Sequence, residues 1–373
     1  MKVSNRQNLI VLPGDGIGPE VIRQAVRVVE WFAAHRGFDC DLQHEDFGAA
    51  AYHRTGSFLK EEVLADMMTA DAVLFGAVGG AIDQYVVPNE VRRRSGLLRI
   101  RKEMGLFANL RPVKPFPALA AGSTLRPEVI EGADLVVVRE LTGGIYFGEP
   151  RGIETLPNGE RRGVNTQVYT TSEILRIGRV AFDLARTRRN KVTSVDKANV
   201  MESGALWREE IKGLHEREYP DIALDHLYVD NAAMQLIRAP RQFDVIVTDN
   251  LFGDILSDCA SMISGSLGML PSASLSAPDE NGHRRALYEP VHGSAPDIAD
   301  QDKANPLAAI QSFAMALELS YGRAADARLL DSAIEAVLAD GTRTGDIAGP
   351  GTKTLVSTSG MGNAVIAALE RLI

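Results

Sequence analysis

The stretch FDVIVTDNLFGDILSD, residues 243–258, decides the fold of this chain. Its first part is an apolar run from Phe243 to Val247, which is typical of a buried strand, and the polar turn residues Asp249 and Asn250 follow. The remainder has helical spacing, so we predict a strand that turns directly into a helix. Strand–helix units of this kind build α/β proteins, and ligands often bind where the strand ends.

The same alternation continues along the chain. Predicted strands cover residues 9–12, 72–76, 135–138, 191–195 and 224–229, and predicted helices cover residues 19–36, 172–186, 202–219, 306–321, 325–338 and 360–372. This pattern predicts an α/β fold with a largely parallel sheet.

Length and composition restrict the class of protein. At 373 residues the chain suggests two domains or lobes, and its 45% hydrophobic and 24% charged residues are ordinary for a soluble protein. The formal net charge of −9 argues against a nucleic-acid partner. Cys40 and Cys259 have no metal-ligand spacing and fit a reducing compartment. Without a signal-like start or an apolar stretch approaching the ~18 residues of a membrane span, we expect a cytoplasmic protein.

Asp254 and Asp258 form the first candidate site. Residues four apart on a helix project from the same face, where two like charges repel unless a cation lies between them. Asp230 closes another apolar run and supplies a third acid. Carboxylate oxygens suit Mg²⁺ or Mn²⁺, so we predict a metal site, with a solvated helix face as the alternative.

The segment GDGIG, residues 14–18, resembles a dinucleotide-binding fingerprint but has the wrong spacing. The Rossmann pattern requires G-x-G-x-x-G and an acid at a second strand end roughly 20 residues later, where this chain has a predicted helix. We therefore predict that the fold is not a Rossmann fold.

Three arginines and two possible proton carriers are further candidates, and of these Arg139 and Lys197 lie just after predicted strands. Arg101, Arg111 and Arg139 can bind carboxylates through paired N–H groups, although each singly is more typical of a surface ion pair. Lys197 can serve as a base where burial or neighbouring cations lower its pKa, and Tyr146 as an acid. A packed tyrosine and a solvated lysine are the alternatives.

The segment at residues 289–306 is the candidate cofactor loop. Gly293, Ser294 and Ala295 allow the backbone to approach a ligand closely. Asp297 can accept hydrogen bonds from both hydroxyls of an adenosine ribose and would repel a 2′-phosphate, which favours NAD over NADP.

Several segments together resemble the 3-isopropylmalate dehydrogenases, a branch of the metal-dependent β-decarboxylating dehydrogenases. They occur in the family's order along nearly the whole chain: GDGIGPE (14–20), GLLRIRKEMGLFANLRP (96–112), RELTGGIYFGEP (139–150), DKANV (196–200), YVDNAAMQL (228–236), NLFGDILSD (250–258) and GSAPDIA (293–299).

The resemblance implies NAD-dependent oxidative decarboxylation of (2R,3S)-3-isopropylmalate in leucine biosynthesis. Arg101, Arg111 and Arg139 would bind the substrate carboxylates, while Lys197 would be the base and Tyr146 the acid. The metal would be held by Asp230, Asp254 and Asp258, and Asp230 would also contact the substrate.

The resemblance also implies a two-lobed fold with a large mixed, mostly parallel sheet. Residues 1–106 plus 266–373 would bind the cofactor, and residues 107–265 would carry the substrate, metal and dimer contacts. Lys197 and Asp230 would reach the site of the partner subunit, so a homodimer is expected. The cofactor residues would be Gly80, His292, Gly293, Ser294, Ala295, Pro296, Asp297, Ile298, Ala304 and Asn305.

Substrate identity depends on a few positions. Leu97 and Leu98 match the apolar pocket for the alkyl group, but Arg93 and Arg94 replace a usual Pro-Glu pair. Residues 81–83 (Ala-Ile-Asp) also depart from the family pattern, and Asp300 stands where the family has glycine. The alternatives are a paralogue acting on tartrate, D-malate or homoisocitrate, and a non-catalytic regulatory subunit.

Overall fold

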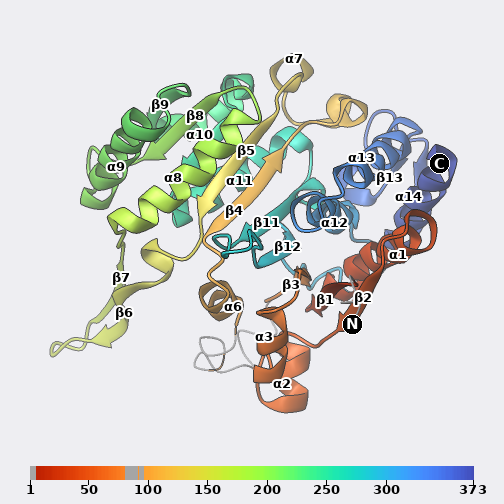
Figure 1. The fold of residues 1–373 in the computed structure, drawn as a ribbon, viewed down its shortest axis with the longest axis horizontal. Helices are drawn as coiled ribbons and strands as arrows, with labels where there is room; N and C mark the ends of the chain where they lie inside the picture. The colour runs from red at the N-terminus through yellow and green to blue at the C-terminus, as the bar shows by residue number, and fades with distance from the viewer. Residues whose placement is uncertain (1–5, 80–90, 92–95) are drawn as a thin grey trace. The chain divides into compact units, whose positions relative to one another are not determined.

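The computed structural model describes residues 6–79, 91 and 96–373 (Figure 1). The chain divides into two compact units. Unit 1 comprises residues 1–106, 115–131 and 261–373, and unit 2 comprises residues 107–114 and 132–260. The expected lobes differ from these units chiefly in residues 115–131, which belong to unit 1. One reason is a hydrogen bond of 2.8 Å from Arg343 Nη2 to the carbonyl of Ala118. The lobe functions stay predictions.

The strands of unit 1 run in the order β2-β1-β3-β12-β11. The pairs β2–β1, β1–β3 and β3–β12 are parallel, whereas the pair β12–β11 is antiparallel. The bounds are β1 Gln7–Gly14, β2 Cys40–His44, β3 Ala72–Ala77, β11 Pro271–Leu275 and β12 Ala286–Pro290, with a separate pair β13 Thr342–Arg343 and β14 Thr354–Leu355.

Helices pack on this part of the sheet and on one another. α1 contacts β1 and β3, α12 contacts β3, β11 and β12, and α13 and α14 complete the layer. The aromatic rings of Phe32, Phe38, Phe313 and Tyr321 join α1 to α12. The helices are α1 Gly18–Arg36, α2 Ala49–Thr55, α3 Glu61–Met67, α6 Leu97–Glu103, α7 Pro127–Ile130, α12 Leu307–Leu319, α13 Ala324–Ala339 and α14 Thr358–Leu372, with 3₁₀ turns η1 Pro117–Gly122, η4 Leu267–Met269 and η5 Gly345–Ile347.

The strands of unit 2 run in the order β4-β5-β10-β8-β9, and only the β4–β5 pair is antiparallel. Their bounds are β4 Ala108–Val113, β5 Leu135–Glu140, β8 Lys191–Asp196, β9 Ala223–Tyr228 and β10 Val245–Thr248. The helices are α8 Thr171–Arg186, α9 Glu202–Glu218, α10 Val229–Arg238 and α11 Asn250–Ser264, with 3₁₀ turns η2 Gly144–Tyr146 and η3 Pro240–Gln242. The hairpin of β6 Gly148–Thr155 and β7 Arg161–Thr166 extends away from the strands of its unit (Figure 1).

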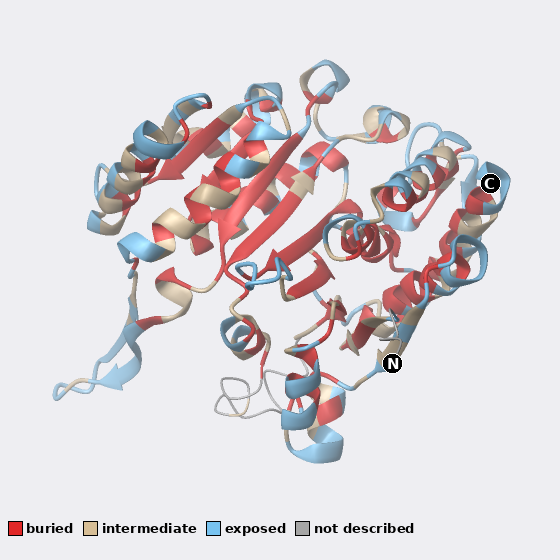
Figure 2. Cartoon of the chain, viewed as in Figure 1, coloured by how far each residue is buried: buried red, intermediate tan, exposed pale blue. Residues whose placement is uncertain are grey.

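Local sequence explains these elements. The first four residues of β5 (LVVV) and the first three of β10 (VIV) are apolar, and both strands are entirely buried, as expected where helices cover a mostly parallel sheet. The burial of β5 is visible in Figure 2. α8 starts with a capping box, in which the Thr170 side chain and the Glu173 side chain each bind the other's backbone N–H. α8 packs on β5, β8 and β10, so the amphipathic helix covers the strands that carry the candidate site.

The predicted α/β fold with a mixed, mostly parallel sheet is confirmed. The strand that precedes residues 249 and 250 and the helix that follows it are both present as β10 and α11. Among the described residues, no helix is long and apolar enough to cross a membrane.

The glycines of residues 14–18 allow close packing of backbones. Gly14 pairs with Ala77 of β3 and has φ of +75°, and a Cβ atom there would lie 1.8 Å from the Ala77 carbonyl oxygen. A Cβ on Gly16 would lie 2.0 Å from the carbonyl oxygen of Ser294. Contacts this short exclude any side chain, so the segment has a structural reason for its glycines.

Gly14→Ala should lower the free energy of unfolding by more than about 3 kcal/mol, because its methyl group would overlap a backbone carbonyl at a left-handed residue. Gly105→Ala is the matched control, since Gly105 has φ of +66° but no atom within 4 Å of its Cβ position. Backbone strain alone should then reduce stability by about 1 kcal/mol. Urea unfolding of both variants compares the losses, and equal losses would contradict the packing argument.

Candidate active site

α11 places Asp254 and Asp258 one turn apart, directly after β10. Their side chains are 37% and 57% exposed. Partial burial, followed by the neighbouring charge of Asp254, raises the pKa of Asp258. The two carboxylates therefore repel each other, which a bound cation would relieve.

Two buried arginines from adjacent strands face Asp254. Arg111 of β4 directs Nη1 to Asp254 Oδ1 at 3.3 Å and to Asp258 Oδ1 at 3.7 Å. Arg139 of β5 donates from Nη1 to the same oxygen of Asp254. Only 5% of Arg111 and 3% of Arg139 is exposed, so the surface ion-pair alternative is wrong for both. Buried guanidinium groups require such partners to offset the loss of hydration.

Tyr146 completes this cluster. It lies in η2, and its hydroxyl donates to Asp254 Oδ2 at 3.4 Å. The Arg139 guanidinium lies 5.8 Å from the centre of its ring. Burial, followed by the negative charge of Asp254, raises the pKa of Tyr146. The phenol therefore stays protonated at neutral pH and is able to donate a proton.

Three residues that sequence analysis did not assign to the site fix the arginines. Arg111 Nε donates to Asn109 Oδ1 at 2.7 Å, and its Nη1 donates to Ser257 Oγ at 2.6 Å. Asn250, noted in the sequence only as a turn residue, accepts two hydrogen bonds from Arg139. The sequence offers one signal for these residues, which is an amide side chain close to a candidate arginine or at a strand end. It does not reveal the strand register that brings each amide to its arginine.

Lys197 and Asp230 form an ion pair of 2.7 Å in unit 2. Lys197 follows β8, whereas Asp230 lies in the first turn of α10, because β9 ends at Tyr228 rather than at Val229. Lys197 lowers the pKa of Asp230 through this contact. Within the described part of one chain, no three His, Cys, Asp or Glu residues gather at a possible metal site. One copy thus does not group Asp230 with Asp254 and Asp258.

The remaining substrate candidates belong to unit 1. Arg101 of α6 donates from Nη2 to Glu289 Oε1 of β12 at 2.8 Å, and both side chains are largely buried. Leu97 packs against the core of its unit, while Leu98 is 41% exposed. Arg93, Arg94 and residues 80–83 lie outside the described residues.

The cofactor candidates of unit 1 form a loop around Ser294 and the start of α12. The Ser294 carbonyl accepts from Ile17 N at 2.8 Å, and its hydroxyl donates to the Gly79 carbonyl. Asn305 is buried and donates to Asp346 at 3.0 Å, and Ala304 is buried beside it. His292, Gly293, Ala295, Pro296 and Ile298 are partly or fully exposed. Asp300, at φ of +59°, has the left-handed backbone expected where the family has glycine.

Three features of this loop fit a nucleotide. Asp297 is exposed, and a Cβ on Gly293 would meet no atom within 4 Å, so the backbone is open there. The Nε2 atom of His292 is buried and has no hydrogen-bond partner among the described residues. Burial lowers the pKa of His292, so a neutral imidazole is available to a ligand.

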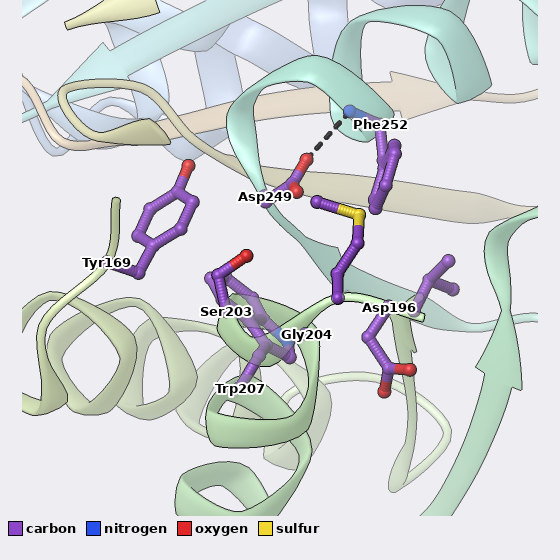
Figure 3. A pocket seen from close by; sticks show the side chains of 9 residues that line it. Tyr169, Asp196, Ser203, Gly204, Trp207, Asp249 and Phe252 are labelled. Atoms are coloured by element: carbon purple, nitrogen blue, oxygen red, sulfur yellow. Dashed lines mark hydrogen bonds between the residues drawn. The ribbon is translucent and has the colours of Figure 1, made fainter. Parts of the chain in front are cut away.

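Asp249 is a buried acid at the start of α11. Its Oδ1 accepts from Phe252 N at 2.7 Å (Figure 3). Its Oδ2 accepts from Gln167 Nε2 at 2.7 Å. A small cavity lies beside it, lined also by Tyr169 and by Ser203 and Trp207 of α9. Burial raises the pKa of Asp249 from 3.8 to about 6.

Asp249→Asn should change the pH dependence of stability. Because the unfolded state loses this proton at lower pH than the folded state, stability from the protonated group is present below about pH 4 and is lost as pH rises through 6. Ionisation costs up to about 3 kcal/mol at neutral pH, at about 1.4 kcal/mol per pKa unit. Relative to the wild type, the free energy of unfolding of the variant should therefore increase by up to this amount between pH 4 and pH 7. A difference independent of pH would refute the assignment.

Comparison with known proteins gives the family of the chain. Residues 8–365 match the isocitrate/isopropylmalate dehydrogenase family. The 3-isopropylmalate dehydrogenase of Rhodospirillum rubrum is 59% identical over 372 residues, covering 100% of both chains, and that of Cereibacter sphaeroides is 59% identical over 364 residues, covering 97% of this chain and 98% of the relative.

Solved structures agree with this match. Isocitrate dehydrogenase from Methylococcus capsulatus superposes with a TM-score of 0.84 at 34% identity, over 97% of this chain and 99% of that chain. A β-decarboxylating dehydrogenase from Thermococcus kodakarensis gives 0.75 at 34% identity, over 98% and 96% of the two chains. The chain therefore belongs to the isocitrate/isopropylmalate dehydrogenase family.

Proposed function

We propose that this chain is an NAD- and metal-dependent 3-isopropylmalate dehydrogenase. The reaction would oxidise (2R,3S)-3-isopropylmalate at C2 and release CO₂ to give 4-methyl-2-oxopentanoate, in leucine biosynthesis in the cytoplasm. The observation that carries the proposal is the cluster of Arg111, Arg139, Tyr146 and Asp254, whose side chains are of the types that bind carboxylates, donate a proton and ligate a metal. The high identity to two 3-isopropylmalate dehydrogenases supports the substrate.

Arg111 and Arg139 would bind substrate carboxylates. Both guanidinium groups are buried and already fixed by hydrogen bonds to Asn109, Ser257 and Asn250, so binding requires little further ordering. Arg101, paired with Glu289 in unit 1, would bind a further carboxylate oxygen.

The residues present fit a divalent cation. Asp254 and Asp258 provide hard oxygen donors whose mutual repulsion a cation would relieve, and Asp230 of a second copy would add a third. When bound, the cation would polarise the oxygen on C2 as a Lewis acid, and NAD⁺ would accept hydride from that carbon.

Two side chains would move the protons. Lys197, once it has released its own proton to become a neutral amine, would take the proton of the C2 hydroxyl as hydride leaves C2 for the nicotinamide, giving a β-keto acid. Loss of CO₂ leaves an enolate, and Tyr146 would donate its phenol proton to C3. The raised pKa of Tyr146 keeps its phenol protonated until the enolate forms, and its hydrogen bond to Asp254 holds the hydroxyl beside the acids that would bind the metal.

A homodimer would supply the residues that one copy does not group together. Asp230 and Lys197 pair with each other, and the same unit exposes apolar side chains on helices: Met234 at 61% and Ile237 at 41% on α10, and Ile255 at 50% on α11. Burying these side chains against a second copy would remove apolar surface from water. The partner subunit's Lys197 and the partner subunit's Asp230 would then complete each site.

Two alternatives remain distinct. A paralogue acting on tartrate, D-malate or homoisocitrate would use the same cluster, and Arg94 would bind the third carboxylate in the case of homoisocitrate. A non-catalytic regulatory subunit would be expected to lack Tyr146, Lys197 or a metal acid, and this chain has all of them.

3-Isopropylmalate should be the preferred substrate in NADH-formation assays with Mg²⁺ or Mn²⁺. Burial of the isopropyl group near Leu97 and Leu98 is worth about 2 kcal/mol, or about 10- to 100-fold in kcat/KM over D-malate. A chelator should abolish turnover in the same assay. A higher kcat/KM for isocitrate, homoisocitrate, tartrate or D-malate would overturn the proposed substrate.

Asp297→Lys should shift cofactor preference from NAD⁺ toward NADP⁺. Loss of a hydrogen bond to the ribose diol and removal of its negative charge should change the ratio of kcat/KM values by at least about tenfold, or 1.4 kcal/mol. Glu280→Lys, an exposed charge reversal between β11 and β12, is the control for net charge. An unchanged preference in Asp297→Lys, or the same shift in both variants, would place the selectivity elsewhere.

A further inference from the structure

Asn250 is a buried side chain beside the cluster whose amide group is fully hydrogen-bonded. It is 1% exposed, and its Oδ1 accepts from Arg139 Nε at 3.0 Å and from Arg139 Nη2 at 2.8 Å. Its Nδ2 donates to the carbonyl oxygens of Leu141 and Gly143, both at 3.1 Å. A carboxamide offers two acceptor and two donor positions, and all four are engaged here.

The acceptor side fixes the direction of Arg139. Two of its guanidinium nitrogens are held by Asn250, and the third, Nη1, is thereby directed to Asp254. Gly253 of α11 packs against the aliphatic part of the same side chain, since a Cβ on Gly253 would lie 2.6 Å from Arg139 Cγ. Arg139 is therefore held in one orientation between the start of α11 and its own strand.

The donor side fixes the loop that carries Tyr146. Leu141 and Gly143 connect β5 to η2, so both carbonyls bound by Asn250 lie within five residues of Tyr146. The backbone N–H of Asn250 donates to the Tyr169 hydroxyl at 2.9 Å, and a Cβ on Gly144 would lie 2.6 Å from that same hydroxyl. The loop is therefore confined between Asn250 and Tyr169.

We propose that Asn250 is a positioning residue that sets the carboxylate-binding Arg139 and the loop of the proton donor Tyr146 with one amide group. This inference rests on the proposed function, because it takes the roles of Arg139 and Tyr146 from it. A residue that only capped α11 would need neither side-chain contact.

Two variants separate the two halves of the amide. Asn250→Asp keeps oxygen acceptors for Arg139 but loses the donors to Leu141 and Gly143. Asn250→Leu has a similar volume and loses both sets of contacts. Asp244→Asn is the control, because Asp244 is buried at the other end of β10, where it binds Arg188 and Arg189 rather than the cluster.

The measurements are kcat, KM, the solvent deuterium isotope effect on kcat, and the Kd of 3-isopropylmalate by calorimetry with Mn²⁺, each beside a melting temperature. Asn250→Asp should lower kcat by about 10- to 100-fold, as expected for a misplaced proton donor, and should keep Kd within about threefold of the wild type. Its isotope effect should rise, since proton donation becomes slower. Asn250→Leu should also bind the substrate more weakly, with a Kd about tenfold or more above that of the wild type.

The outcomes are decisive. Asp244→Asn should lower the melting temperature while leaving kcat and Kd within about twofold of the wild type. Kinetic losses in the Asn250 variants no larger than in this control at equal melting temperature would overturn the inference. If Asn250→Asp weakened substrate binding by the same factor as it lowered kcat, the inference that the amide donors position the Tyr146 loop separately from Arg139 would be overturned. Should Asn250→Leu fail to fold, Asn250→Asp decides alone. A wild type inactive on every 2-hydroxy diacid would instead overturn the proposed function, and the inference with it.

Discussion

The contact of two buried guanidinium groups with Asp254 is the interaction on which the rest of the site depends. Removing Arg111 and Arg139 from water costs several kcal/mol for each charge unless a carboxylate and further hydrogen bonds replace the solvent. Asp254 provides the carboxylate, and Asn109, Ser257 and Asn250 provide the hydrogen bonds. Antiparallel pairing of β4 with β5 brings the arginines together, and α11, starting immediately after β10, brings Asp254 to them.

The sequence predicted those parts of the fold that depend on local patterns. Apolar runs marked β5 and β10, and the helix that carries Asp254 and Asp258 follows from their spacing. The strand before Asp230 was predicted one residue too long, because Val229 continues the apolar run but opens α10. Residues 115–131, expected in the substrate lobe, belong to compact unit 1, since contacts such as Arg343 with Ala118 join positions far apart in sequence.

The supporting residues of the site could not be predicted in the same way. Asn109 contacts Arg111 on its own strand, but whether both are buried depends on the pairing of β4 with β5. Asn250 lies 111 residues from Arg139 in sequence, and only the parallel register of β5 with β10 makes them neighbours. Family resemblance identifies the groups that would contact substrate, but it says little about the groups that hold them in place.

Charge balance unites these observations. Arg111 and Arg139 carry two positive charges, and Asp254 and Asp258 carry two negative charges when both are ionised, so the cluster is close to neutral by itself. A divalent cation and a substrate with two carboxylates would also neutralise each other, and the pair of Lys197 and Asp230 adds no net charge while Lys197 is protonated. When the cation and the diacid replace water in such a site at the same time, no buried charge is left unpaired. Either ligand alone would leave an excess charge, so electrostatics favour joint binding of the cation and the diacid.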